Sequence, residues 1–178
     1  MVSKRILITY WNHRFYIKQG HAYLVKEEKS HFSFHAFKTI IRKGFKGLCL
    51  TVLTPYMLSK KYNVRKTSII RLGKQAPIRD VWLHKQNPTV LSPTDPGRLV
   101  HLIKEFTTKN KESVVLLDAL EYLIIHNGFS MVVKVITDIN ELIMVNKSIL
   151  FVPINPKAFS EKELALLERN FEIINLKR

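Results

Sequence analysis

Asp118, Glu121 and His126 are residue types that could perform acid–base chemistry. Asp118 ends the apolar run Val114-Val115-Leu116-Leu117, which is typical of a strand buried on both faces in a parallel sheet. Asp118 would then lie at the carboxyl end of that strand, where open α/β sheets bind ligands. Glu121 follows on a helix that we expect to pack on the sheet. We therefore favour structural roles, with Asp118 as the cap of the helix that begins after it.

His31 and His35 are four residues apart on a predicted helix and could share a metal ion. No acidic or cysteine third ligand lies nearby, so we interpret them as surface histidines. The single cysteine, Cys49, lies in an apolar run and is expected to be a buried hydrophobic residue. One cysteine allows no internal disulfide, which fits a reducing cytosol. We expect no metal, no cofactor and no catalytic residue, and therefore a protein that is not an enzyme.

Positive charge is the strongest chemical signal in the 178 residues, which carry a formal net charge of +15. Residues 1–74 contain 16 Lys and Arg but only two acids, Glu27 and Glu28, and so hold a net charge of +14. The natural partner of such a surface is a polyanion. The alternative is a lysine-rich solvated face of the thermophile type, which usually carries matching glutamates. Because those glutamates are missing here, we favour polyanion binding.

Residues 1–20 interleave basic and aromatic side chains, a composition that suits phosphates and unpaired bases. Alternatively, the aromatic residues pack onto the domain or onto a second subunit, and the sequence leaves both interpretations open. Further basic residues follow up to residue 66. The candidate nucleic-acid-binding residues are Lys4, Arg5, Tyr10, Trp11, Arg14, Tyr16, Lys18, Arg42, Lys43, Lys46, Lys60, Lys61, Arg65 and Lys66.

The elements that must position these residues alternate between strand and helix patterns. Residues 1–20 predict a β-hairpin or arm, with strands at 5–11 and 14–18 and a turn at Asn12-His13. We treat this segment as separate from an α/β domain spanning 21–178. Further strands are predicted at 22–25, 47–53, 69–72, 81–83, 114–118, 148–152 and 171–176. This alternation predicts a mostly parallel sheet flanked by helices.

Helices are predicted from their apolar spacing and their caps. Ser30 is expected to cap a helix that runs to about residue 43, and Thr54 to cap one that ends near 62. Ser160 and Glu163 form a capping-box pattern near the C-terminus. Other helices are expected at 99–110, 119–126 and 129–146, and residues 87–97, with three prolines, as an irregular loop. In the helix expected at 129–146, the residues that should point into the core are Val132, Val133, Ile136, Ile139, Ile143 and Met144.

The chain resembles an archaeal family of domains of unknown function over roughly residues 21–176. The resemblance is carried mainly by Leu116-Leu117-Asp118-Ala119-Leu120-Glu121-Tyr122-Leu123 with His126-Asn127-Gly128-Phe129. Supporting matches are Tyr23-Leu24-Val25, Gly47-Leu48-Cys49, Pro93-Thr94-Asp95 and Glu161-Lys162-Glu163-Leu164-Ala165-Leu166-Leu167-Glu168. Domains of this family look like shortened relatives of RecA-type ATPase domains, which implies a three-layer RecA-like architecture.

The RecA resemblance implies that Tyr23-Leu24-Val25 is the strand before a phosphate loop and that Asp118 corresponds to the acid that helps hold magnesium. A phosphate loop needs glycines, so that backbone N–H groups can wrap the phosphates, followed by Lys and Ser or Thr. Residues 26–32 instead read Lys-Glu-Glu-Lys-Ser-His-Phe, without a glycine and with two acids. We therefore expect no ATP binding of the standard kind.

These features favour a non-enzymatic binding protein for RNA or ribonucleoprotein. RNA is preferred to DNA because no helix-turn-helix, zinc-finger or basic-zipper pattern is visible. Since a ribosomal subunit is the largest structured RNA target in a cell, our best interpretation is a ribosome-associated factor. It would bind rRNA and occupy or tether a subunit, regulating translation through dimerisation or anti-association. The alternatives are a DNA-binding or protein–protein signalling module and, third, a divergent nucleotide-binding enzyme.

The sequence carries fewer signals for the cellular location and the oligomeric state of the protein. The apolar run after the first basic residues is too short for a signal peptide, and no stretch approaches the ~18 apolar residues of a membrane span. We therefore expect a cytoplasmic protein without a membrane partner. The N-terminal arm could add a strand to a neighbouring subunit, and a homodimer is expected.

Overall fold

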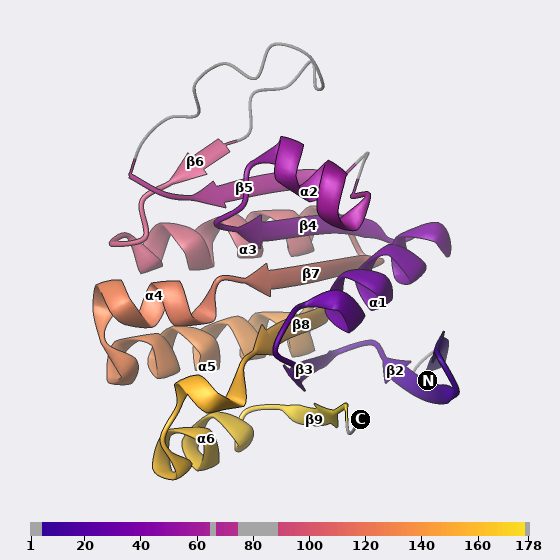
Figure 1. Cartoon of the computed structure of the whole chain (residues 1–178). Coiled ribbons are helices and arrows are strands. Elements are labelled where there is room, and N and C mark those ends of the chain that lie inside the picture. Colours follow the sequence, from indigo (N-terminus) through magenta and orange to yellow (C-terminus); the bar gives the residue numbers. More distant parts are fainter. Residues whose placement is uncertain (1–4, 65–66, 75–88, 177–178) are drawn as a thin grey trace.

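A seven-stranded parallel sheet organises the molecule, with helices on both of its faces and a small hairpin at the N-terminal end (Figure 1). The structure is a computed structural model that describes residues 5–64, 67–74 and 89–176. Every strand pair in the large sheet is parallel. The predicted α/β class, with a parallel sheet flanked by helices and an N-terminal hairpin, is confirmed. The strand expected at 81–83 lies outside the described residues.

The strands of the large sheet follow the order β6-β5-β4-β7-β8-β3-β9. The strand β7, at its centre, is buried on both faces along residues 113–117, as its unbroken apolar run predicts. The bounds are β3 His21–Lys26, β4 Lys46–Thr51, β5 Ser68–Leu72, β6 Thr89–Leu91, β7 Ser113–Asp118, β8 Ile149–Ile154 and β9 Glu172–Asn175.

The strand β6 corrects the irregular loop expected at 87–97. Its three residues pair with β5, so that Leu72 lies opposite Leu91, and both side chains are buried. A three-residue strand is too short to show an alternating pattern. Pairing with a neighbour distant in sequence therefore decides its conformation.

Six helices are described, and they divide between the two faces of the sheet. The helices α1 and α2 share one apolar core with the hairpin, and α3 to α6 share the other. In Figure 1, α1 crosses the near side of the sheet while α3 passes behind it. The bounds are α1 His31–Arg42, α2 Pro55–Tyr62, α3 Pro96–Lys109, α4 Leu120–Asn127, α5 Phe129–Val145 and α6 Glu161–Glu168, with a 3-10 turn at Pro156–Ala158.

Local capping chemistry follows the sequence at two helices. The Thr54 side chain accepts a hydrogen bond from the Met57 N–H at the start of α2. At α6, Ser160 accepts from the Glu163 N–H, and the Glu163 carboxylate accepts in return from the Ser160 N–H. Both caps satisfy N–H groups that lack a partner inside the helix.

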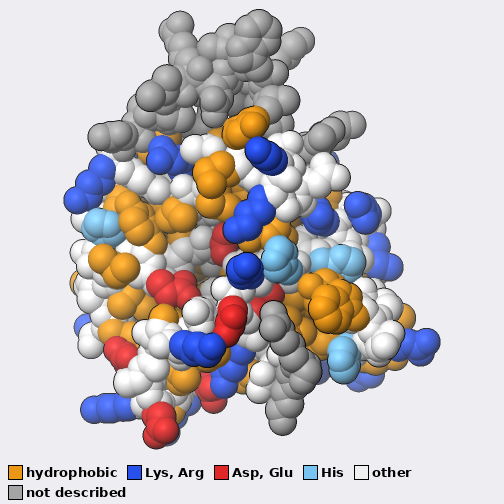
Figure 2. Space-filling view, viewed as in Figure 1, with side chains coloured by type: hydrophobic (Ala, Val, Ile, Leu, Met, Phe, Trp, Pro, Cys, Tyr) orange, Lys and Arg blue, Asp and Glu red, His pale blue; other side chains and the backbone are white. Residues whose placement is uncertain are grey.

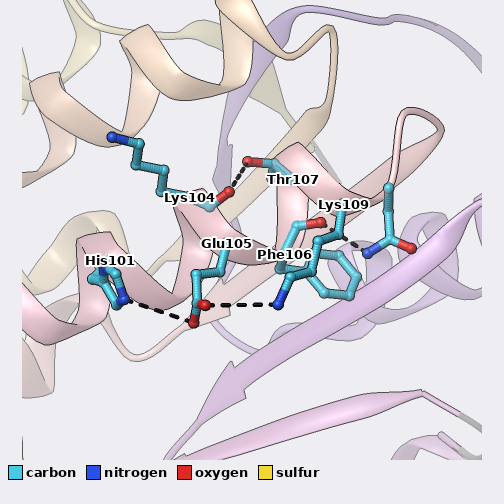
Figure 3. Close-up of polar contacts among 7 residues, drawn as sticks. His101, Lys104, Glu105, Phe106, Thr107 and Lys109 are labelled. Carbon is cyan, nitrogen blue, oxygen red and sulfur yellow. Dashed lines mark hydrogen bonds and ion pairs between the residues drawn. The ribbon is translucent and has the colours of Figure 1, made fainter.

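The outer face of α3 shows an ordinary solvated helix surface (Figure 3). Glu105 lies between His101, one turn before it, and Lys109, one turn after it, at N–O distances of 3.7 and 3.6 Å. Exposed pairs at this spacing stabilise a helix by only a few tenths of a kcal/mol. This helix therefore offers surface positions suited to control substitutions.

The longest described helix, α5, departs from the prediction at one residue. Val132, Ile136, Ile139 and Ile143 are buried as expected, but Met144 is 63% exposed. Each residue turns by about 100° around a helix, so the neighbour of an inward residue points sideways. Among the described helices, none is both long enough and apolar enough to cross a membrane.

The hairpin consists of β1, Arg5–Tyr10, and β2, His13–Lys18, in an antiparallel pair. Tyr10 lies opposite His13, so the turn falls on Trp11 and Asn12 and not on Asn12 and His13 as expected. Trp11 has a φ of 51°. The earlier turn is favoured because this register directs Ile6, Ile8 and Ile17 into the core beneath the hairpin.

Candidate functional site

The carboxyl ends of β4 and β7 meet at a point where the chain changes direction across the sheet. After β4 the chain passes through α2 to β5 on one side, and after β7 it passes through α4 and α5 to β8 on the other. Thr51 and Asp118 are opposite one another in register at this point. Open α/β sheets bind ligands in the crevice outside such a reversal. This edge is therefore the position in the fold where a ligand site is expected.

Asp118 is held there by hydroxyl groups from two other elements. Its carboxylate accepts a hydrogen bond from Ser30 Oγ at 2.7 Å and from Thr51 Oγ1 at 3.3 Å. Burial raises the pKa of Asp118 to about 6, and Glu121 adds to this rise, while the hydroxyl groups and Lys61 oppose it. Asp118 does not cap the next helix as expected, because the cap position of α4 belongs to Ala119.

Glu27 fills the N-terminus of α1. Its carboxylate accepts from the N–H groups of Phe32 and Ser33, at 2.9 and 3.1 Å, and from Ser33 Oγ. The expected cap, Ser30, makes no side-chain bond to the helix because its hydroxyl donates to Asp118. Burial raises the pKa of Glu27 to about 7, with its own hydrogen bonds opposing and Asp118 adding to the rise.

The position of the Glu27 carboxylate affects whether an anion can bind at the N-terminus of α1. A helix N-terminus is where a phosphate would bind, since its free N–H groups and dipole attract negative charge. Here an internal carboxylate already takes those N–H groups. The sequence shows the acids of this loop, but it could not show which N–H groups Glu27 would accept from.

The other residues singled out for chemistry make structural contacts. The Glu121 carboxylate accepts from the Asn155 N–H at 2.9 Å, which joins α4 to the end of β8. His31 lies edge-on to Tyr62, and His35 Nε2 is 3.0 Å from the Thr9 carbonyl oxygen. The two histidines thus contact different elements. Within the described ranges, no three residues of metal-binding type come together.

Cys49 is buried in β4, as predicted. Burial raises the pKa of its thiol well above the ordinary value. A raised pKa keeps the thiol protonated, and the protonated form is the unreactive one. The structure therefore agrees with the interpretation of Cys49 as a packing residue.

The hairpin separates its side chains into an inner and an outer face. Ile6, Ile8 and Ile17 are buried against the core. The alternation of side chains along a strand places the intervening residues on the opposite, solvent side. On that outer face Arg5 lies opposite Lys18, Leu7 opposite Tyr16, and Thr9 opposite Arg14. Three predicted nucleic-acid-binding cations therefore flank Tyr16, which is 59% exposed.

The sequence left open whether the aromatic residues of the hairpin bind unpaired bases or pack onto the domain or a second subunit. In the structure these residues fall into two groups. Tyr10 and Phe15 pack onto Phe32 of α1, with ring centroids 5.2 and 4.7 Å apart. Trp11 projects at the turn, 80% exposed, and stacks on Tyr10 at 5.7 Å. The domain therefore uses Tyr10 and Phe15 for its own packing and leaves Trp11 and Tyr16 accessible.

The remaining predicted cations lie at the end of α1, at the start of β4 and on α2. Arg42 and Lys43 lie at the end of α1, Lys46 begins β4, and all three are exposed. Lys60 and Lys61 are exposed on α2, over the rings of Tyr56 and Tyr62 at 6.0 and 5.0 Å. Neither helix contains an acidic residue. Lys4, Arg65 and Lys66 lie outside the described residues.

These cations share one layer of the molecule but do not form one cluster. We call this set the basic layer: Arg5, Arg14, Lys18, Arg42, Lys43, Lys46, Lys60 and Lys61. Lys18 Nζ also lies 3.6 Å from Glu172 of β9. Figure 2 shows basic and histidine side chains spread over the view, with acidic side chains near its middle and toward its lower left. In this view the basic side chains are therefore dispersed over the surface and do not form a single patch.

Comparison with known proteins places the chain in a family without assigning it an activity. The chain belongs to the family described as "Protein of unknown function (DUF835)", whose model matches residues 25–171. It is similar to a solved structure from Pyrococcus horikoshii OT3, described only as a structural study. Identity is 14% and the TM-score 0.59, covering 89% of this chain and 83% of that one. Such a likeness shows the fold alone. No curated protein matches the chain.

Proposed function

We propose that this DUF835-family protein is a non-enzymatic binder of RNA or ribonucleoprotein that acts through the basic layer. The observation that carries the proposal is the outer face of the hairpin. There Arg5, Arg14 and Lys18 flank Tyr16, and Trp11 projects beyond them. Cations bind phosphates, and exposed aromatic faces stack on unpaired bases. RNA is favoured over DNA because single strands and loops present such bases.

Glu27 supports the expectation that the protein does not use ATP. If the domain is RecA-like, its phosphates would bind between the end of β3 and the start of α1. The Glu27 carboxylate accepts from the N–H groups of Phe32 and Ser33 at that position. A triphosphate would have to displace the Glu27 carboxyl group from these N–H groups. A titration of the full chain with labelled ATP and magnesium tests this expectation, and saturable binding would favour a divergent nucleotide-binding enzyme.

A ribosomal subunit is the proposed target, since its surface offers structured RNA with both helices and exposed bases. The protein would occupy or tether a subunit, and so regulate translation through dimerisation or anti-association. Native cell extract is sedimented through gradients at low and high salt, and the protein is detected in the fractions. Comigration with subunits or their dimers at low salt, lost at high salt, is expected. Migration at the top of both gradients would remove the ribosome as the target.

The role of the hairpin is tested by charge reversal. Arg5, Arg14 and Lys18 are changed together to Glu, and binding to a single-stranded RNA and to ribosomal subunits is measured. We expect binding to be abolished. The matched control changes Lys104, Lys134 and Lys162 to Glu, on helices of the opposite face. Equal loss of binding in both variants would show that only total charge matters and would remove the site assignment. Preference for duplex DNA in the same assay would favour the DNA-binding alternative.

A protein–protein module is the second candidate, favoured by the outer edge of the hairpin. Among the described strands, β1 and β2 pair only with each other, so their outer edges could add a strand from a second copy, although the Thr9 carbonyl already contacts His35 Nε2 and the Lys18 N–H already donates to the Tyr23 hydroxyl. Deleting residues 1–20 is a poor test, because it would uncover the core beneath Ile6, Ile8 and Ile17. Leu7→Glu, on the outer face, is preferable. A dimer that becomes a monomer in light scattering would support hairpin-mediated association.

A further inference from the structure

Two histidines of α1 connect the hairpin with α2, and in Figure 1 α1 lies between these two elements. The His35 ring is 5.2 Å from that of Tyr10, and its Nε2 lies 3.0 Å from the Thr9 carbonyl oxygen. His31, one helical turn earlier, contacts Tyr62 at the end of α2, with ring centroids 5.8 Å apart. Because residues four positions apart occupy one side of a helix, the histidines form a surface that joins the two elements.

This surface has an exposed ring at one end and a cation at the other. Trp11 is 80% exposed and stacks on Tyr10 at 5.7 Å, at the turn of the hairpin. Lys61 is exposed on α2, with its Nζ 5.0 Å from the centroid of the Tyr62 ring. A ring beneath an ammonium attracts its charge, while the solvent-facing N–H groups stay available to a phosphate. We call this set the ring path: Trp11, Tyr10, His35, His31, Tyr62 and Lys61.

Acidic groups lie beside the ring path, but each of them has a partner inside the protein. The carboxylates of Glu27 and Asp118 accept hydrogen bonds from the protein, and Glu28 is paired with Lys157. Burial raises the pKa of Asp118, and Lys61 is near enough to oppose that rise. A cation close to a carboxylate reduces the repulsion that the carboxylate exerts on a phosphate. These acids therefore do not close the path to a polyanion.

We propose that a single unpaired RNA strand binds along the ring path, from the turn of the hairpin across α1 to α2. This route rests on the proposed RNA binding by the basic layer and adds His31 as a contact residue. Bases would stack on Trp11 and His31, and Lys61 would bind a phosphate at the far end. His35 would act as a positioning residue, because it holds the hairpin against α1. A duplex is excluded as the ligand, since its bases stack on one another.

The route is tested on the full chain with uridine homopolymers of about 4 and about 12 nucleotides, lengths within the range of known single-strand sites. Fluorescence anisotropy gives the affinity for each. The short RNA can occupy the hairpin alone, whereas the long RNA can reach α2. His31→Ala is therefore expected to weaken the long RNA about fivefold or more, the effect of one lost stacked base, and to leave the short RNA nearly unchanged.

Two further variants separate stacking and charge from a structural effect at His31. His31→Phe keeps an aromatic ring and should bind the long RNA as the wild type does. Lys61→Gln, at an exposed position on another element, should weaken the long RNA severalfold and leave the short RNA unchanged. The matched controls are His101→Ala and Lys104→Gln, both exposed on α3 in the layer of the other core, and should change neither affinity.

Several results would overturn the route. Wild-type affinity for the long RNA in both His31→Ala and Lys61→Gln is one of them. Another is binding by His31→Phe that is as weak as binding by His31→Ala, since a stacked ring would then make no contribution.

Failure of the route can be told from failure of the proposed function. The triple Glu variant of Arg5, Arg14 and Lys18 should lose both RNAs. If it does so while the His31 and Lys61 variants bind as the wild type, RNA binding by the hairpin stands and the route across α1 is overturned. If the wild type binds neither RNA, the proposed function fails and the route fails with it.

Discussion

The Glu27 side chain determines whether the N-terminus of α1 is available to an anion. It takes the N–H groups at the start of α1 that would otherwise be available to an anion. Burial raises its pKa to about 7, although its hydrogen bonds favour the ionised form. Near neutral pH the carboxyl is therefore close to its midpoint, and Asp118, with a pKa of about 6, lies near enough to influence it.

The raised pKa of Glu27 predicts a specific pH dependence of stability. Between pH 4.5 and about 7 the folded protein binds more protons than the unfolded chain, so its free energy of unfolding falls as the pH rises. Relative to Glu27→Gln, which cannot titrate, the wild type should lose about 2 kcal/mol between pH 5 and pH 7.5. Urea unfolding of both proteins at the two pH values measures this, and identical pH dependence would contradict it.

Trp11 allows binding to be separated from folding at one position. It is 80% exposed and has a φ of 51°, so Trp11→Gly removes the ring and suits the backbone. We expect the free energy of unfolding to change by less than about 1 kcal/mol. Affinity for single-stranded RNA should fall by about 1–3 kcal/mol, the contribution of one stacked base. Fluorescence anisotropy with labelled RNA measures it, and unchanged affinity would remove Trp11 from the interface.

At the scale of elements, the contact between α1 and β4 leaves no room at Gly47. A Cβ atom there would overlap the Ile41 side chain and Thr67 Oγ1. Gly47→Ala should therefore destabilise the protein by about 1–3 kcal/mol, the usual cost of overpacking. Gly97→Ala on α3 is the matched control, since its Cβ would come no closer than 3.9 Å to Asp95 Oδ1. Urea unfolding should show the control unchanged or slightly stabilised. Equal stability of both variants would contradict the close approach.

The hairpin acts as an element with two separate tasks. Its inner face belongs to the same apolar core as α1 and α2, through Ile6, Ile8 and Ile17. Its outer face carries Arg5, Arg14 and Lys18. Substitutions on the outer face can therefore change binding while the core remains intact.

At the scale of the whole molecule, the excess charge gives a prediction about salt. Each cation that contacts a phosphate of single-stranded RNA should contribute about −0.7 to the slope of log affinity against log salt. Changing Lys43, Lys60 and Lys61 to Gln should therefore reduce the magnitude of that slope by about 2. Lys104, Lys134 and Lys162 changed to Gln should leave it as in the wild type. Anisotropy titrations between about 50 and 200 mM salt measure both slopes. Equal slopes in all three proteins would place the contacts elsewhere.

Much of the fold follows from local patterns in the sequence. The unbroken apolar run before Asp118 predicted the central strand, and the caps at Thr54 and Ser160 predicted where helices begin. These predictions depend on neighbours within four residues, whose interactions recur in any protein with the same pattern. The wrong predictions concern side chains that could bond a neighbour in the sequence but instead bond a residue far away in it. Ser30 was expected to cap α1, but its hydroxyl donates to Asp118, 88 positions away.

The sequence by itself determined the α/β class, the concentration of positive charge before residue 75, and the absence of glycine from residues 26–32. Composition and short-range periodicity are enough for these features, because each is a property of consecutive residues. Only the tertiary structure decided that Glu27 fills the N-terminus of α1, which hairpin side chains face solvent, and that His31 and His35 connect the hairpin with α2. The physical reason is that strand order and helix packing bring together residues that no local pattern relates.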